Sequence, residues 1–270
     1  MEKKIGFIGC GNMAQAIIGG LVKSKNFLPK KIYIYDYHIE KMQFIYQKYG
    51  IVLTVNATEV AKNVQILFLA VKPHTILTVL KELYSNNIIN KELLVVSLAV
   101  GLTLSQLEMV VPPECKVVRV MSNTTTIVGE GMTSVTPNEF VTQHELNEIL
   151  YIFNIIGKTA IVPEYLIHTV VGVSSSAPAY VYMFIEAMAD AAVLSSMPRT
   201  QAYNFIAQTI KGAAQMVLTT GKHPGELKDQ VCSPNGTTIE AIKLLEEKGF
   251  RATVMAAVQA CIDKSINLTK

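Results

Sequence analysis

The sequence lacks the features that mark metal-binding, secreted and nucleic-acid-binding proteins. Its four cysteines lie far apart without a CxxC pair, and no histidine is spaced to complete a metal site. We therefore expect no metal centre and a reducing cytoplasm, where scattered free thiols persist. Only 17% of the residues are charged, and the net charge is +3. Basic and acidic residues are interspersed, so we expect neither nucleic acid nor a membrane surface as a partner.

Long membrane-spanning runs are also missing. The longest uncharged run, Thr169 to Ile185, contains three successive serines and Pro178, which makes it a poor membrane span. A strand-like segment starts at Lys4, and we expect no signal peptide ahead of it. Half of the 270 residues are hydrophobic, enough for a large core. This high apolar content favours burial of a further face between subunits.

Short apolar segments alternate with helical patterns over roughly the first 160 residues. Strands rich in β-branched residues and separated by helices predict βαβ units and a mostly parallel sheet. The predicted strands are Lys4–Ile8, Lys31–Tyr35, Ile51–Val55, Gln65–Val71, Leu93–Leu98, Lys116–Met121, Thr133–Thr136 and Lys158–Val162, with a helix over Glu139–Ile155.

The pattern changes after Pro163, where strand-like segments stop. Pro178–Leu194 has no polar face, which predicts a helix buried nearly all round. Further helices are predicted over 198–220, 224–231, 238–248 and 250–269. We therefore predict an α/β domain over residues 1–162, with a doubly wound sheet of Rossmann type, and an all-helical domain over 163–270. We interpret the second as a dimerisation domain; a monomeric bundle folded back on the sheet is the alternative.

A glycine motif follows the first predicted strand. In Gly9-x-Gly11-x-x-Ala14, the first glycine permits a tight turn and the second lets the backbone approach a pyrophosphate. The small third residue allows close packing of helix on strand. The second predicted strand ends in Asp36, where an acidic residue accepts hydrogen bonds from ribose hydroxyls. This context predicts a dinucleotide site; a glycine turn in an unrelated α/β protein is the alternative.

A second turn lies near the carboxyl end of the chain. Ser233-Pro-Asn-Gly236 leads into Thr237, Thr238 and a helical pattern. Gly236 can adopt a positive φ without steric cost. The threonines then fall at a helix N-terminus, where free N–H groups and the helix dipole favour a carboxylate or phosphate. Taken alone, the turn favours a capped helix with no ligand, because such residues are the usual helix caps; the rest of the chain changes that interpretation.

Five motifs, spread over the whole length, carry a family resemblance. They are Gly6-Phe-Ile-Gly-Cys-Gly-Asn-Met-Ala14, Ala70-Val-Lys-Pro73, Arg119-Val-Met-Ser-Asn-Thr124, Pro178-Ala-Tyr180 and the segment His223–Ile239. Together they resemble the pyrroline-5-carboxylate reductases. The last segment is the most specific, because the glycine motif occurs in many dehydrogenases.

The resemblance implies reduction of the cyclic imine 1-pyrroline-5-carboxylate to L-proline, the last step of proline synthesis, with NADPH or NADH. It also implies a homodimer with interleaved helices, which in the family often assembles into decamers. Asp36 bears on the cofactor, because its carboxylate accepts hydrogen bonds from the ribose of NADH and repels the 2′-phosphate of NADPH. We expect both cofactors to work, with NADH less disadvantaged than in relatives that carry arginine there.

The resemblance further assigns individual residues. The loop of Gly9, Cys10, Gly11, Asn12 and Met13 would hold the pyrophosphate. The remaining cofactor residues would be Asn56, Ala70, Lys72, Pro73, Ser97, Ala99 and Asn123. The substrate would be bound by Glu164, Ser233, Gly236, Thr237 and Thr238. Thr238 would be catalytic, as the group that orients the ring nitrogen or relays a proton, because a hydroxyl is too weak an acid for ordinary general-acid catalysis.

The chain departs from the family pattern at five positions. Ser122 and Thr125 stand where proline is usual, and Ser175, Ala177 and Asn235 stand where glycine is usual. Asparagine tolerates left-handed backbone geometry, so Asn235 is compatible with the turn. We expect the other departures to affect local packing and efficiency rather than the type of reaction.

Two other functions stay open. One is a related Rossmann-plus-helical dehydrogenase acting on another imine or a hydroxyacid. Hydroxyacid enzymes of that kind place a catalytic lysine early in the helical domain, and Gly172–Tyr182 has none. The other is a catalytically silent, regulatory relative, suggested by the missing prolines and glycines. Retention of Lys72, Glu164, Thr237 and Thr238 argues against it.

Overall fold

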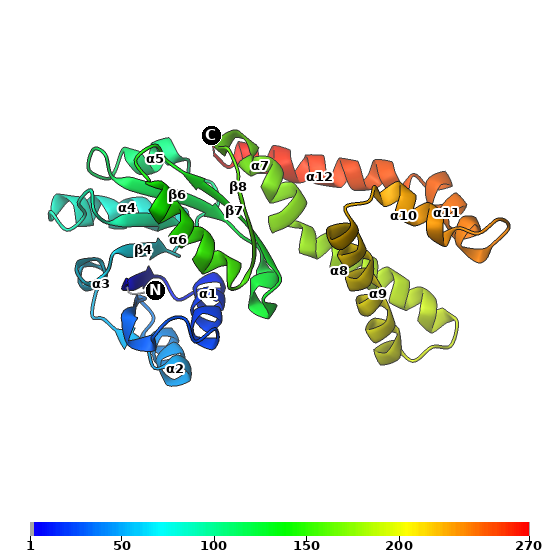
Figure 1. The fold of residues 1–270 in the computed structure, drawn as a ribbon, viewed down its shortest axis with the longest axis horizontal. Coiled ribbons are helices and arrows are strands. Elements are labelled where there is room, and N and C mark those ends of the chain that lie inside the picture. Colours follow the sequence, from blue (N-terminus) through cyan, green and yellow to red (C-terminus); the bar gives the residue numbers. More distant parts are fainter. Residues whose placement is uncertain (1–2, 270) are drawn as a thin grey trace. The chain divides into compact units, whose positions relative to one another are not determined.

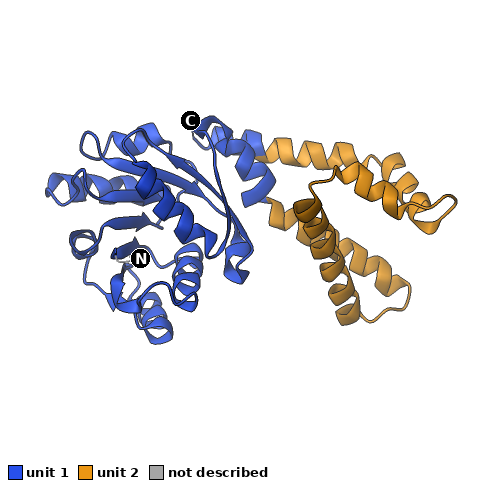
Figure 2. Ribbon diagram, viewed as in Figure 1, with its two compact units in different colours: residues 1–176, 262–270 blue, residues 177–261 orange. Residues whose placement is uncertain are grey.

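The computed structural model describes residues 3–269 and divides the chain into two compact units (Figure 2). Unit 1 comprises residues 1–176 and 262–270, and unit 2 comprises residues 177–261. The division falls after Ser176, whereas the composition of the sequence changes at Pro163. The intervening residues belong to unit 1 because several of their side chains bond to its sheet and loops, as the candidate site shows.

Unit 1 is built on one sheet of eight strands in the order β3-β2-β1-β4-β5-β6-β7-β8 (Figure 1). All neighbouring strands are parallel except β6 and β7, which are antiparallel. This confirms the predicted doubly wound, mostly parallel sheet. The strands are β1 Ile5–Ile8, β2 Ile32–Tyr35, β3 Val52–Leu53, β4 Ile66–Leu69, β5 Leu94–Ser97, β6 Lys116–Met121, β7 Gly131–Pro137 and β8 Gly157–Ile161.

Helices cover both faces of the sheet because alternate strand residues point to opposite sides. Ile5 and Phe7 of β1 join one core with α1, α2 and α6, whereas Ile8 joins a second core with α3, α4 and α5. Phe7 stacks on Phe68 of β4 with ring centroids 4.7 Å apart. The helices are α1 Asn12–Lys23, α2 Ile39–Tyr49, α3 Ala57–Asn63, α4 Pro73–Ser85, α5 Leu104–Glu108 and α6 Gln143–Asn154.

Local sequence signals explain where individual helices begin. The helix predicted over Glu139–Ile155 begins instead at Gln143, because Thr142 accepts the N–H of Glu145 and the Glu145 side chain returns to the N–H of Thr142. This capping box fixes the first turn. Shorter helical segments complete unit 1: η1 Pro29–Lys31, η2 Thr124–Val128, η3 Glu164–Leu166, α7 Ile167–Val170 and the π-helical turn η4 Val171–Ser175.

Unit 2 is all-helical, as predicted. Its helices are α8 Ala177–Leu194, α9 Arg199–Thr220, α10 Pro224–Val231, α11 Thr237–Glu247 and most of α12 Phe250–Asn267. A small core of Ala189, Ala202 and Ile206 joins α8 to α9.

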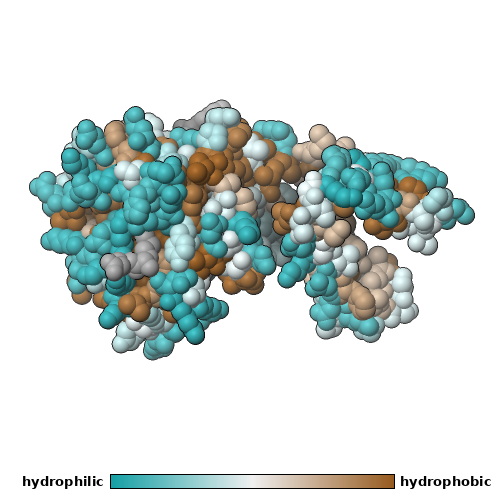
Figure 3. Space-filling model, in the orientation of Figure 1, coloured by the Kyte–Doolittle hydropathy of each residue, from teal (hydrophilic) through white to brown (hydrophobic). Residues whose placement is uncertain are grey.

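The prediction that the apolar helix α8 is buried nearly all round is wrong within this chain. Ala189 is its one buried residue, and Tyr182 and Met183 are 59% and 70% exposed. Apolar side chains therefore reach the surface of unit 2 (Figure 3). The apolar composition of α8 suits burial against another protein surface, which this chain alone does not provide. By length and composition, Glu164–Leu194 is also apolar enough to cross a membrane, which is weak evidence from a single segment.

Candidate active site

The glycine loop lies at the carboxyl edge of β1 and leads into α1. Gly9 has φ +104°, and a Cβ there would lie 2.7 Å from the carbonyl atoms of Ala70, so no other residue fits. At Gly11 the nearest atom to an added Cβ is the Ala70 oxygen, at 3.9 Å. The backbone before α1 is therefore open to a close ligand. The free N–H groups and the positive dipole end at the start of α1 favour an anion. The first turn of α1 contains no acidic residue that would compete with it.

Asp36 anchors this loop. Its Oδ2 accepts the N–H of Cys10 at 2.7 Å, and its Oδ1 accepts the N–H of His38 at 2.9 Å. The Nδ1 atom of His38 lies 3.0 Å from the same Oδ1. Burial favours a higher pKa for Asp36, but these hydrogen bonds and the charge of Lys41 hold its pKa below the ordinary value. The sequence predicts a ribose contact for Asp36; the structure adds a bond that holds the cofactor loop.

The thiol of Cys10 is buried inside the loop. Burial, together with the neighbouring charge of Asp36, raises the pKa of Cys10 to about 12. The thiol therefore stays protonated and places no negative charge beside the pyrophosphate position. Within residues 3–269, no group of three His, Cys, Asp or Glu side chains is arranged to hold a metal.

The sheet brings four predicted cofactor residues to one edge. The register pairs Ile8 with Leu69 and Leu69 with Ser97, so Gly9, Ala70 and Ser97 all lie where parallel strands end. Asn123 follows β6 at the same edge. Ligands of open α/β sheets bind outside the carboxyl ends of the strands.

The other predicted cofactor residues lie at helix starts and in turns of unit 1. Asn56 caps α3, accepting the N–H of Glu59 at 2.8 Å. Lys72 and Pro73 form the start of α4, and the Lys72 side chain makes no ion pair with any described residue. The N–H of Ala99 lies 3.4 Å from the Ser97 hydroxyl. Cofactor contacts of these residues stay predictions.

Glu164 is held by a buried arginine. Its Oε1 accepts hydrogen bonds from Nη1 of Arg119 at 2.9 Å and from the N–H of Leu104 at 2.7 Å. The side chain of Arg119 is 2% exposed, and that of Glu164 is 33% exposed. Sequence reasoning missed this pair, although a charged residue within the apolar strand Lys116–Met121 was a usable signal. A substrate contact of Glu164 stays a prediction, and it would have to use the exposed part of the carboxylate.

Next to this pair, His168 joins α7 to the end of α12. Its Nδ1 atom lies 2.9 Å from the hydroxyl of Ser265. Burial lowers the pKa of His168 and Arg119 lowers it further, while Glu164 opposes them. His168 therefore has a structural partner in Ser265.

The predicted substrate turn lies in unit 2, directly before α11. Asn235 has φ +57°, the left-handed geometry that asparagine tolerates, whereas Gly236 has φ −85°. Gly236 therefore does not use the positive φ that glycine permits, and Asn235 adopts it instead. A Cβ at Gly236 would lie 2.4 Å from the Ser233 hydroxyl oxygen, which can rotate away, and 3.1 Å from the Ser233 carbonyl oxygen, so glycine relieves a tight contact within the turn. Among the described residues, none bonds to the hydroxyls of Ser233, Thr237 or Thr238.

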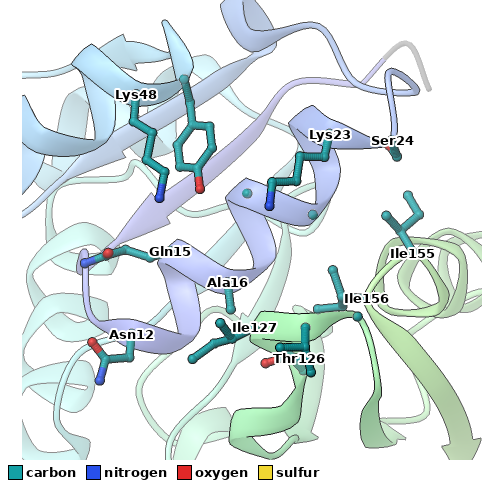
Figure 4. A pocket seen from close by; sticks show the side chains of 15 residues that line it. Asn12, Gln15, Ala16, Lys23, Ser24, Lys48, Thr126, Ile127, Ile155 and Ile156 are labelled. Carbon is teal, nitrogen blue, oxygen red and sulfur yellow. The ribbon is translucent and has the colours of Figure 1, made fainter.

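A groove of about 720 Å³ runs along the outer side of α1 (Figure 4). It starts at Asn12 of the glycine loop, and Gly19 and Gly20 form part of its floor. The side chains of Lys23 and Lys48 reach toward it, and no acidic residue lines it. Of the predicted site residues, only Asn12 lines this groove, so it extends away from the cofactor loop along the helix.

Comparisons with known proteins agree with the geometry. A family model described as "Pyrroline-5-carboxylate reductase dimerisation" matches residues 164–268, and one described as "NADP oxidoreductase coenzyme F420-dependent" matches residues 4–101. The pyrroline-5-carboxylate reductase of Escherichia coli K12 is 53% identical over 270 residues, covering 100% of both chains. That of Methanosarcina acetivorans is 42% identical and covers 100% of this chain and 99% of the relative.

Solved structures give the same result. A pyrroline-5-carboxylate reductase from Coxiella burnetii matches with a TM-score of 0.92 at 34% identity, covering 100% of both chains. The Plasmodium falciparum enzyme, solved with NADP bound, matches with a TM-score of 0.89 at 30% identity, covering 100% of this chain and 99% of the other. Identity and coverage at this level extend over both units, and the chain belongs to the pyrroline-5-carboxylate reductase family.

Proposed function

We propose that this chain reduces 1-pyrroline-5-carboxylate to L-proline with NADPH or NADH. The observation that carries the proposal is the turn Ser233–Gly236 with the start of α11. No described residue bonds to the hydroxyls of Ser233, Thr237 and Thr238, and no side chain caps the N-terminus of α11. Together with the open glycine loop of unit 1, it provides one site for a dinucleotide and one for a small carboxylate. The family membership of the whole chain supports the same assignment.

The cofactor suits the residues of unit 1. Gly9 and Gly11 leave the backbone open over the N-terminus of α1, where a pyrophosphate accepts hydrogen bonds from free N–H groups. Asp36 holds Cys10 of that loop and faces the adenosine side in the predicted arrangement. When bound, the reduced nicotinamide supplies the hydride. Asn123, Ser97 and Ala99 then border the nicotinamide at the ends of β5 and β6.

The substrate residues orient a charged imine. The N–H groups at the start of α11, with the hydroxyls of Ser233 and Thr237, bind the carboxylate. The hydroxyl of Thr238 hydrogen-bonds to the ring nitrogen, which orients the imine or relays to it the proton that makes it an iminium before hydride transfer. Hydride addition to the carbon of the C=N bond moves the π-electron pair onto nitrogen, which keeps its proton and becomes a secondary amine. No protein nucleophile is needed for this step.

We further propose that a second copy of the chain covers the apolar surface of α8. Val181 and Phe184 are 40% and 41% exposed in the single chain, and exposed apolar surface of this extent marks an interaction site. The matched dimerisation family supports a homodimer, and a decamer of such dimers is the larger assembly that the resemblance implies. We place the enzyme in the cytoplasm, as its four free cysteines suggest.

One assay separates these proposals from the alternatives. Purified protein is mixed with NADPH or NADH and with pyrroline-5-carboxylate or a six-membered cyclic imine, and separately with NADP+ or NAD+ and a set of β-hydroxyacids. We expect loss of nicotinamide absorbance with pyrroline-5-carboxylate and formation of proline. Activity restricted to hydroxyacids or the other imine would favour a related dehydrogenase. Cofactor binding without turnover of any of these substrates would favour a silent regulatory relative.

A further inference from the structure

The loop between β6 and β7 carries Asn123 and is closed by hydroxyl groups. The Thr125 hydroxyl oxygen lies 2.7 Å from Oδ1 of Asn123 and 2.7 Å from the carbonyl oxygen of Glu130. Because a hydroxyl carries one hydrogen, it bridges these acceptors or alternates between them. On the other side of Asn123, the Ser122 and Thr133 hydroxyl oxygens lie 2.8 Å apart. Both residues where the family usually has proline therefore hold the loop by side-chain bonds.

The orientation of the Asn123 carboxamide follows from its neighbours. The N–H of Met132 points at one end of the amide, 3.2 Å from the atom assigned as Oδ1. A backbone N–H can only donate, so that end must be the oxygen. Nδ2 then points toward Ser174, at 3.4 Å from its carbonyl oxygen and 3.5 Å from its hydroxyl.

Those two contacts leave the amide nitrogen short of good acceptors. An N–H···O hydrogen bond is usually 2.7–3.2 Å long, so both contacts to Ser174 are weak. Asn123 is also 9% exposed, which makes an under-used donor costly in the free protein. The geometry therefore leaves Nδ2 able to donate to a bound ligand at the end of β6.

We infer that Thr125 is a positioning residue, whose hydroxyl holds the Asn123 carboxamide so that Nδ2 donates to an acceptor on the nicotinamide end of the cofactor. Without that hydroxyl, Oδ1 keeps only the Met132 N–H, and rotation about the last side-chain torsion of Asn123 has a broad energy profile. Proline at this position restricts φ but offers no hydrogen-bond donor. This inference rests on the proposed function, in which Asn123 borders the nicotinamide.

Three variants test it. Thr125→Val removes the hydroxyl at nearly constant shape, and Thr125→Ser restores it. Thr159→Val is the matched control, because the Thr159 hydroxyl in β8 makes a similar bond to Oδ1 of Asn154, 3.1 Å long, and within residues 3–269 it does not bond to Asn123 or Thr125. Loss of one orienting hydrogen bond should lower kcat of Thr125→Val roughly three- to tenfold. KM for the cofactor should change less, because the pyrophosphate and adenosine ends supply most of its binding. Thr125→Ser and Thr159→Val should stay within about twofold of wild type.

Asn123→Ala supplies the decisive comparison. If Thr125 acts through Asn123, adding Thr125→Val to Asn123→Ala should cause no further loss of kcat, giving a large coupling in the double-mutant cycle. Fluorescence of bound NADPH without substrate gives a readout that is independent of turnover. We expect Thr125→Val to change the nicotinamide emission while the dissociation constant stays nearly constant.

Two outcomes overturn the inference. One is wild-type kcat and emission in Thr125→Val; the other is an equal loss from Thr125→Val in the presence and absence of the Asn123 side chain. Failure of the proposed function looks different. Wild-type protein would then not reduce pyrroline-5-carboxylate, while the emission of bound NADPH would still report whether Thr125 orients Asn123.

Discussion

Replacement of Asp36 should have two separable effects, because the carboxylate both bonds the glycine loop and carries a charge. In Asp36→Ser, the N–H of Cys10 loses its 2.7 Å acceptor. Cys10 is fully buried, and a buried unsatisfied donor costs about 1–3 kcal/mol. For a chain of this size, that cost lowers Tm by about 2–10 °C. A loosened loop should also weaken binding of NADH and NADPH alike.

The charge acts on cofactor choice. Two unit charges about 6 Å apart at a partly exposed site repel by about 1–3 kcal/mol. Removal of the carboxylate should therefore raise the ratio of kcat/KM for NADPH to that for NADH by roughly five- to a hundredfold. Asp36→Asn separates the two effects, because the amide is neutral but its oxygen can still accept one of the two backbone N–H groups.

We therefore expect both variants to shift the ratio toward NADPH, and Asp36→Asn to keep more thermal stability and more NADH affinity than Asp36→Ser. The assays are steady-state kinetics with each cofactor and thermal unfolding of the unliganded protein. An unchanged ratio in both variants would mean that Asp36 does not face the ribose. An unchanged Tm in Asp36→Ser would refute the anchoring of the glycine loop.

Three further predictions concern the substrate turn, the surface of α8 and the titration of Asp36. Thr238→Ala should lower turnover of pyrroline-5-carboxylate roughly tenfold to hundredfold, because about 1–3 kcal/mol of transition-state hydrogen bonding is lost. The cofactor dissociation constant should stay nearly unchanged. Wild-type turnover in this variant would remove Thr238 from the mechanism. Val181→Asp places a carboxylate at a position that is 40% exposed in the single chain, so it should be harmless in a monomer. If a second copy covers α8, the variant should be dissociated, inactive or insoluble. Light scattering and activity assays distinguish these results, and a stable, active wild-type monomer at micromolar concentration would refute the dimer. The pKa of Asp36 is lowered in the folded state. Its contribution to stability is therefore present above its unfolded pKa of about 3.9 and is lost as pH falls through the lower folded value. Unfolding curves between about pH 5 and 3 should show a smaller acid-induced loss of unfolding free energy in Asp36→Asn than in wild type.

The candidate site shows how far local sequence patterns reach. The glycine loop, the end of β2 at Asp36 and the turn before α11 were all predicted from residues within a few positions of one another. Such features depend on backbone preferences and helix-end chemistry, which neighbouring residues supply. Helix α10 over Pro224–Val231 has the predicted bounds for the same reason, with Pro224 at its first position and a His223 cap.

Bonds between distant residues were not predictable in this way. Arg119 and Glu164 are 45 residues apart in the sequence, and they meet because the pairing of β6, β7 and β8 brings the segment after β8 close to β6. The bond from Cys10 to Asp36 spans 26 residues, and it requires the parallel register of β1 and β2. The Asn123 carboxamide is oriented by Met132, whose N–H is presented by the antiparallel pairing of β6 and β7.

The sequence by itself determined the order of strands and helices, the two kinds of structural unit, the glycine and threonine turns, and the family, because these reside in local periodicity and short motifs. The tertiary structure decided that Asp36 holds the cofactor loop and that α8 is left uncovered by its own chain. Each of these depends on which distant atoms come within a few ångströms, and only the folded backbone sets those distances.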